Sequence, residues 1–153
     1  MVEGMKTKIL SAEIATKCGA YTIIASAKNT AINELFNGNN RCTVFLPNKS
    51  LPNKKIWMIY AANACGKIAI DNGAVEALKK GASLLLPGIT NVDGDFVEKD
   101  VVEIVDQSDS VIARGITNYS SKVICERLAQ LNEGTLPKKT FKIISHENMA
   151  FLD

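Results

Sequence analysis

Residues 66–89, GKIAIDNGAVEALKKGASLLLPGI, contain a strand, a helix and a second strand with a clear boundary between each pair. The run GKIAI predicts the first strand. Asp71 can cap a helix over residues 72–80, and Gly81 is expected to end that helix. The three leucines at 84–86 predict the second strand. This compact alternation marks the start of a small independent domain.

Turns follow one another closely after this stretch. Short apolar runs, ITNV, VVEIV and VIARGI, are separated by turn-forming residues at 87–88, 93–94, 106–110 and 117–121. Turns at this density predict a small mixed β domain of barrel-like form. A serine cap at Ser120 or Ser121 predicts a helix to about Leu131, and FKIIS adds a late strand.

Residues 1–46 show a different pattern, in which helices and strands alternate. Helices are expected from Met5 to Cys18 and within 29–38, where Asn29 or Thr30 is the expected cap; strands are expected at 21–26 and 41–46. This alternation is typical of an α/β sheet with parallel strands. Two helices and two strands are too few to cover both faces of such a sheet, so we expect an incomplete domain.

The segment 47–55, PNKSLPNKK, is rich in proline, asparagine and lysine, which predicts a linker. The apolar run IWMIYAA after it is expected to dock as a short helix. The chain is therefore predicted to have three parts, an α/β fragment at 1–46, a linker and docking helix at 47–65, and a small β-rich domain with a C-terminal tail at 66–153.

Length and composition are those of a globular protein. The chain has 153 residues, of which 46% are hydrophobic, enough for one domain or two small ones. No apolar run approaches the ~20 residues of a membrane span, and no signal-peptide pattern is present. We therefore expect a cytoplasmic protein without a membrane partner.

The sequence offers no recognisable metal site. The four cysteines are widely spaced, which predicts buried free thiols: Cys18, Cys42, Cys65 and Cys125. The carboxylates between residues 93 and 100 lack the twelve-residue spacing of a calcium loop and predict a solvated turn. The single histidine, His146, is expected to be structural.

Charge is distributed unevenly. Residues 1–65 carry a net charge of +5, residues 66–131 carry −3, and residues 132–153 are balanced. Nucleic-acid backbones are bound mainly through clustered lysine and arginine. The acidic middle segment therefore makes RNA binding by the β-rich domain doubtful.

The segment at 66–89, followed by VDGDF, KDVVEIVD, IARGITNYSS and IISHENM, resembles the C-terminal portion of bacterial glutamate 5-kinase. The first segment, GMKTKILSAEIATKCGAYTIIAS, is similar to that family's Gly-Met-x-Thr-Lys loop with its following helix and strand. The resemblance implies the end of an amino-acid kinase domain followed by a PUA-like pseudo-barrel. It also implies that the rest of the kinase domain lies upstream of Met1.

The resemblance further implies ATP with Mg²⁺ as cofactor, L-glutamate as substrate and proline biosynthesis as the pathway. Lys8 would lie at the transferred phosphoryl group, and the nucleotide would be held by the first turn, Val2, Glu3, Gly4, Met5, Lys6, Thr7 and Lys8. Unpaired helix-start N–H groups and a close-approach glycine suit this role. A homo-oligomer is possible.

Two departures from the family pattern affect these expectations. Val2-Glu3 replaces a Gly-containing pair, which places a negative charge beside the presumed phosphate, and Lys99 replaces a turn glycine. The residues that hold glutamate in the family are upstream of the matched segment, so we expect no complete active site in this chain alone. The alternative is a free-standing PUA-type module that binds RNA or regulates.

Overall fold

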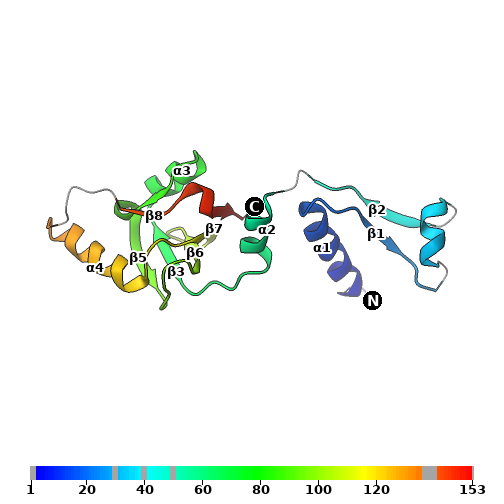
Figure 1. The fold of residues 1–153 in the computed structure, drawn as a ribbon, viewed down its shortest axis with the longest axis horizontal. Helices are drawn as coiled ribbons and strands as arrows, with labels where there is room; N and C mark the ends of the chain where they lie inside the picture. The colour runs from blue at the N-terminus through cyan, green and yellow to red at the C-terminus, as the bar shows by residue number, and fades with distance from the viewer. Residues whose placement is uncertain (1–2, 29–30, 39–40, 49–50, 136–140, 153) are drawn as a thin grey trace. The chain divides into compact units, whose positions relative to one another are not determined.

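The computed structural model describes residues 3–28, 31–38, 41–48, 51–135 and 141–152, and Figure 1 shows the fold. The chain divides into two compact units, Met1–Asn53 and Lys54–Asp153. Among the described residues, no helix has the length and apolar character required to cross a membrane.

The described residues of the first unit form one α-helix, two strands and a 3-10 helix: α1 (Glu3–Lys17), β1 (Thr22–Ala25), η1 (Ile32–Asn37) and β2 (Cys42–Phe45). As expected, Gly19 and Gly38 follow their helices with positive φ angles of 82° and 76°. The i,i+4 pair Glu13–Lys17 closes the last turn of α1 at 3.2 Å.

The expected parallel pairing in this unit is wrong. Strands β1 and β2 run antiparallel, with Thr22 opposite Phe45 and Ala25 opposite Cys42. A parallel pair requires a crossover that packs on the sheet, usually an α-helix. The connecting η1 is a 3-10 helix with no buried residue, so it supplies no such crossover.

The start of the second helix also differs from expectation. The N-cap of η1 is Ala31, and its side chain makes no cap hydrogen bond. The expected caps, Asn29 and Thr30, lie outside the described residues.

Most apolar side chains of the first unit are exposed. Along one side of α1, Ala12 and Thr16 are buried, but Met5 and Ile9 are half exposed. Exposed large apolar residues also occur throughout the rest of the unit: Leu10, Tyr21, Ile32, Phe36, Val44, Leu46 and Leu51. The described part of this unit therefore has almost no core of its own.

The second unit has a mixed five-stranded sheet and a separate two-stranded one. The large sheet has the order β5-β3-β6-β7-β9, and the small one pairs β4 with β8. The strands are β3 (Lys67–Ile70), β4 (Leu84–Leu85), β5 (Ile89–Asp93), β6 (Val101–Val105), β7 (Val111–Ile116), β8 (Lys142–Ile144) and β9 (Met149–Phe151). Strand β9 was not predicted, because three residues carry almost no periodic pattern.

Three α-helices occur at the expected places: α2 (Asn53–Tyr60), α3 (Asn72–Lys79) and α4 (Ser121–Asn132). Two short 3-10 helices were not predicted, η2 (Leu86–Gly88) and η3 (His146–Asn148), and Leu86 lies in η2 rather than in the expected strand. The predicted caps are confirmed. Asp71 accepts a hydrogen bond from the Ala74 N–H at 2.7 Å, and Ser120 accepts one from the Val123 N–H at 3.5 Å. The sheets and α3 and α4 enclose an aliphatic core that includes Ile68, Leu78, Leu84, Ile104, Ile124 and Ile144.

Helix α2 docks on this unit, as the run IWMIYAA predicts. Met58 is fully buried in a small cluster with Val101 and Ala150. The Arg114 guanidinium donates hydrogen bonds to three backbone carbonyls at the end of α2, with a shortest distance of 3.0 Å to the Ile59 oxygen. Its second terminal nitrogen, Nη2, donates to Glu103 Oε1 at 3.0 Å. Arg114 thus satisfies helix-end carbonyls that have no partner within the helix.

The prediction of buried thiols is wrong. All four cysteines are free and exposed. Cys18, Cys42 and Cys65 lie at or beside the ends of elements, and Cys125 lies on an outer position of α4. Cysteine is usually buried in folded proteins, but these four cysteines occupy positions at the surface.

Lys99 adopts a left-handed backbone with φ of 75°, a conformation that favours glycine. Such a conformation costs a non-glycine residue roughly 1–2 kcal/mol. We expect Lys99→Gly to raise the free energy of unfolding by about 1 kcal/mol, after the entropy cost of glycine, and to raise Tm by about 4–8 °C in thermal denaturation. The exposed ion pair between Lys99 and Glu98 contributes little to the balance.

Asp109→Gly is the matched control, because Asp109 has φ of 59°. Aspartate tolerates the left-handed region better than lysine, so Asp109→Gly should raise Tm by less than Lys99→Gly does. An unchanged or lower Tm for Lys99→Gly would contradict the prediction.

Candidate functional site

The residues expected to bind phosphate lie at the start of α1. Gly4, Met5, Lys6, Thr7 and Lys8 are all helical and exposed. Glu3 begins the helix, and Val2 lies outside the described residues. The structure therefore places most of the expected set on the surface of two consecutive helical turns.

Two features of this helix start suit an anion. The first N–H groups of a helix have no intrahelical acceptor, and the helix dipole adds partial positive charge. No heavy atom lies within 4 Å of the position that a Cβ on Gly4 would occupy, so a ligand can approach the backbone there. Lys8 lies one turn further along the same helix.

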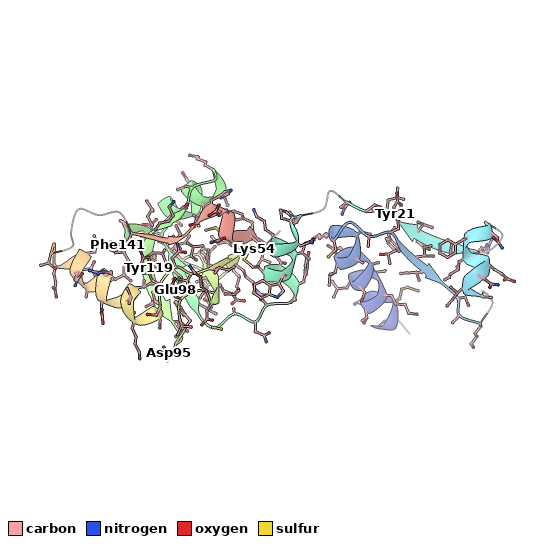
Figure 2. All side chains as sticks on the ribbon, viewed as in Figure 1. Tyr21, Lys54, Asp95, Glu98, Tyr119 and Phe141 are labelled. Atoms are coloured by element: carbon pink, nitrogen blue, oxygen red, sulfur yellow. The ribbon has the colours of Figure 1, made fainter. Side chains whose placement is uncertain are left out.

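The described residues offer no ligand set for the expected Mg²⁺. No group of three or more histidine, cysteine, aspartate or glutamate side chains lies together in the described part of the chain. Two carboxylates of the acidic turn accept hydrogen bonds from protein groups. Asp100 accepts from the Val97 N–H at 2.8 Å, and Asp95, labelled in Figure 2, accepts from the Ser121 hydroxyl at 3.3 Å. The first bond stabilises the turn itself, and the second connects the turn to the first residue of α4.

His146 makes a backbone contact with the segment before β4. Its backbone N–H donates to the Ser83 hydroxyl at 3.1 Å, and this contact ties η3 to the segment before β4. The imidazole lies beside Gly81, with Cε1 3.8 Å from the position of a Cβ on that glycine. Nothing in this arrangement resembles a nucleophile paired with a base.

Sequence reasoning missed an apolar pocket in the second unit, lined by α3 and the β4–η2 segment. Its volume is about 360 Å³. The available signal was the small residues Gly73, Ala74 and Ala77, which recur along one side of α3.

Comparison with known proteins identifies a domain within the second unit. Residues 66–130 match the family model of the PUA domain. The chain contains a PUA domain. This result confirms the expected pseudo-barrel after an α/β fragment. A crystal structure of a PUA domain from Aeropyrum pernix in complex with tartrate is also similar, with 15% identity, a TM-score of 0.47, and coverage of 82% of this chain and 84% of that one.

The similarity to glutamate 5-kinases extends beyond the PUA domain. The chain is 42% identical over 119 residues to glutamate 5-kinase of Thermotoga maritima, and 43% identical over 121 residues to that of Prochlorococcus marinus. Each match covers 77% of this chain but 34% of the relative. The chain thus spans about a third of the length of these relatives and is homologous to that part of them.

Proposed function

We propose that this chain is the C-terminal segment of a glutamate 5-kinase, which phosphorylates L-glutamate to L-glutamyl 5-phosphate with ATP in cytoplasmic proline biosynthesis. Residues 1–46 would end the amino-acid kinase domain, 47–65 would form the linker and docking helix, and 66–153 the PUA domain with its tail. The observation that carries the proposal is the 42–43% identity to glutamate 5-kinases over 119–121 residues.

The exposed apolar side chains of the first unit support this assignment. A small unit that leaves residues such as Ile32 and Phe36 79% exposed carries an apolar surface of the kind that marks an interaction site. The relatives are about three times as long as the matched segment, since it covers 34% of each. The remainder of the kinase domain is therefore the proposed cover of this surface.

Lys8 is the proposed catalytic residue. Its ammonium would neutralise charge on the phosphoryl group as it passes to the γ-carboxylate of glutamate, while the helix start from Val2 to Thr7 would hold the nucleotide. Phosphoryl transfer depends mainly on such positioning and charge neutralisation. Because the described residues offer no metal-ligand cluster, Mg²⁺ would be held by the nucleotide and by the rest of the kinase domain.

A chimera tests the assignment. The first two thirds of the Thermotoga maritima enzyme would be joined to this chain at the point where their alignment begins. We expect ATP-dependent formation of γ-glutamyl hydroxamate from L-glutamate and hydroxylamine. A folded chimera that lacks this activity would contradict the proposal, provided that the parent enzyme is active in the same assay.

Lys8→Ala should lower kcat of the chimera by about 10²–10³-fold, because a charge that stabilises the transition state is lost. Lys17→Ala is the matched control, since Lys17 lies at the opposite end of α1, where it pairs with Glu13. The control should keep kcat within about twofold, the expected effect of a surface ion pair being small. Equal losses of kcat in both variants would contradict the proposed role of Lys8.

The alternative function, an RNA-binding PUA module, leads to a separate prediction. Residues 66–131 carry a net charge of −3, and non-specific binding depends on lysine and arginine. We expect the second unit, residues 54–153, to bind generic single-stranded RNA with Kd weaker than about 1 µM at physiological salt, a range typical of non-specific contacts. Filter binding that gave a tighter, salt-sensitive Kd would favour the RNA-binding alternative.

A further inference from the structure

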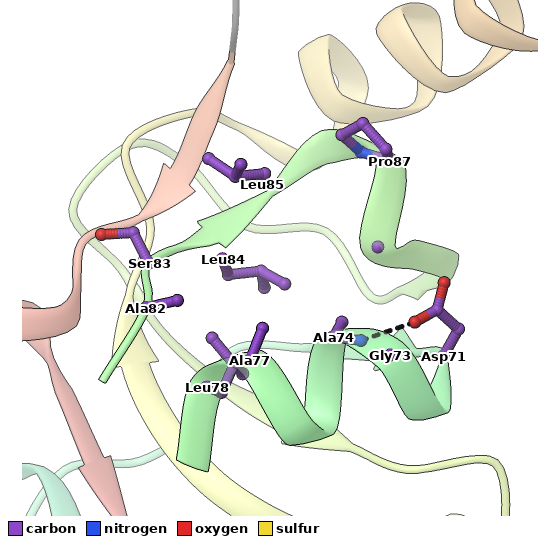
Figure 3. A pocket seen from close by; sticks show the side chains of 11 residues that line it. Asp71, Gly73, Ala74, Ala77, Leu78, Ala82, Ser83, Leu84, Leu85 and Pro87 are labelled. Carbon is purple, nitrogen blue, oxygen red and sulfur yellow. Dashed lines mark hydrogen bonds between the residues drawn. The ribbon is translucent and has the colours of Figure 1, made fainter. Parts of the chain in front are cut away.

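The pocket of the second unit has a mostly apolar wall, shown in Figure 3. Helix α3 contributes Gly73, Ala74 and Ala77, and the facing segment contributes Ala82, Leu84 and Leu85. The small residues keep the space open. A Cβ on Gly88 would lie 2.7 Å from the Ala74 Cβ, so glycine is required where η2 passes close to α3.

Two polar side chains lie at opposite ends of this pocket in Figure 3, Asp71 at one and Ser83 at the other. The carboxylate of Asp71 uses Oδ1 to cap α3, and a carboxylate has acceptor positions for further donors. Asp71 is the one ionisable side chain among the described residues that line the pocket. The pocket therefore has a negative end and no lysine or arginine in its wall.

We propose that this pocket binds a small organic ammonium ion that carries an apolar ring. The ring would lie between α3 and Leu84, and the ammonium group would donate to Asp71. The volume of about 360 Å³ is within the range of small-molecule sites, which combine apolar walls with a few polar groups that fix orientation. Charge complementarity favours a cation over a carboxylate or phosphate.

The test compares two probes of similar size and opposite charge, 2-phenylethylammonium and 3-phenylpropionate, on the whole 153-residue chain. Amide chemical shifts in ¹H–¹⁵N spectra report both the site and the affinity. We expect the ammonium probe to shift the amides of Ala74, Ala77 and Leu84 with Kd of about 1 mM, a value usual for so small a ligand. The carboxylate probe should bind at least about tenfold more weakly, since its charge opposes that of Asp71.

Two variants separate charge from shape. Asp71→Asn keeps a good helix cap but removes the charge, so Tm should be unchanged and the preference for the ammonium probe should fall below about twofold. Ala77→Leu should fill the pocket and weaken both probes. Ala129→Leu, at an exposed position of α4, is its control and should change neither affinity.

Three outcomes would overturn the proposal. They are the absence of shifts at about 10 mM ammonium probe, ten times the expected Kd, equal affinity for the two probes, and an undiminished preference in Asp71→Asn. A result in which single-stranded RNA shifts the same amides while the ammonium probe has no effect would also overturn the proposal and would assign the pocket to nucleic acid. None of these outcomes depends on the kinase activity.

Discussion

The purified 153-residue chain should form no γ-glutamyl hydroxamate above background when ATP, Mg²⁺ and L-glutamate are supplied. If this chain is the proposed segment, its helix start with Gly4 and Lys8 would hold only part of a nucleotide, and the groups that bind glutamate and the other phosphates would lie in the remainder of the kinase domain. Correct positioning of two reactants can supply ~7–11 kcal/mol of a barrier. Turnover should therefore be about 10⁵–10⁸-fold below that of the chimera.

The hydroxamate assay measures this difference directly, with the chimera as positive control. Lys8→Ala in the isolated chain should leave the background signal unchanged, whereas the same substitution in the chimera lowers kcat. Clear activity of the isolated chain that disappears in Lys8→Ala would show that a complete active site lies within these residues. Circular dichroism of both samples would verify that each is folded.

Gly94→Ala should destabilise the PUA-containing unit by about 3–5 kcal/mol, because two costs are added at one position. Gly94 has a positive φ of 91°, which costs alanine roughly 1–2 kcal/mol. A Cβ there would also lie 2.8 Å from the Cα of Gly66 and 2.9 Å from the Cys65 carbonyl oxygen. Both neighbours are backbone atoms beside the β3–β5 pairing, so relief requires displacement of a strand.

Thermal denaturation followed by circular dichroism should show Tm lowered by about 15–30 °C for a unit of this size. Gly134→Ala is the matched control, because Gly134 also has a positive φ, 70°, but no heavy atom within 4 Å of the position of its Cβ. Gly134→Ala should lower the free energy of unfolding by about 1–2 kcal/mol, which is the conformational cost alone. Equal losses in the two variants would show that the close backbone approach at Gly94 adds nothing.

The secondary structure of residues 66–132 could be predicted well, because residues close in sequence determine where its helices and strands begin and end. Asp71 and Ser120 cap helices with their own side chains, and Gly81 ends α3 with a φ of 90°. Such caps depend on residues three or four positions away. The turns between the strands from β3 to β7 are likewise indicated by the residues within each turn. The PUA match to residues 66–130 agrees with this part of the prediction.

The candidate phosphate site was predicted from a resemblance rather than from spacing. The structure places Gly4 to Lys8 together on α1, as any helix would place adjacent residues. What this site binds depends on groups beyond α1, and no local pattern describes them. No local pattern predicts the pocket beside Asp71 either. The leucines of β4 and the alanines of α3 become its opposite walls only when the two segments pack.

The sequence alone determined the α-helices and most strands, because propensity, caps and turns act over a few residues. Only the tertiary structure decided the partners of those elements. It paired β1 with β2 antiparallel, added β9 beside β7, placed Arg114 on the carbonyls of α2 and left the four cysteines exposed. These features arise from contacts between residues distant in the chain, and their energies depend on packing that no short stretch contains.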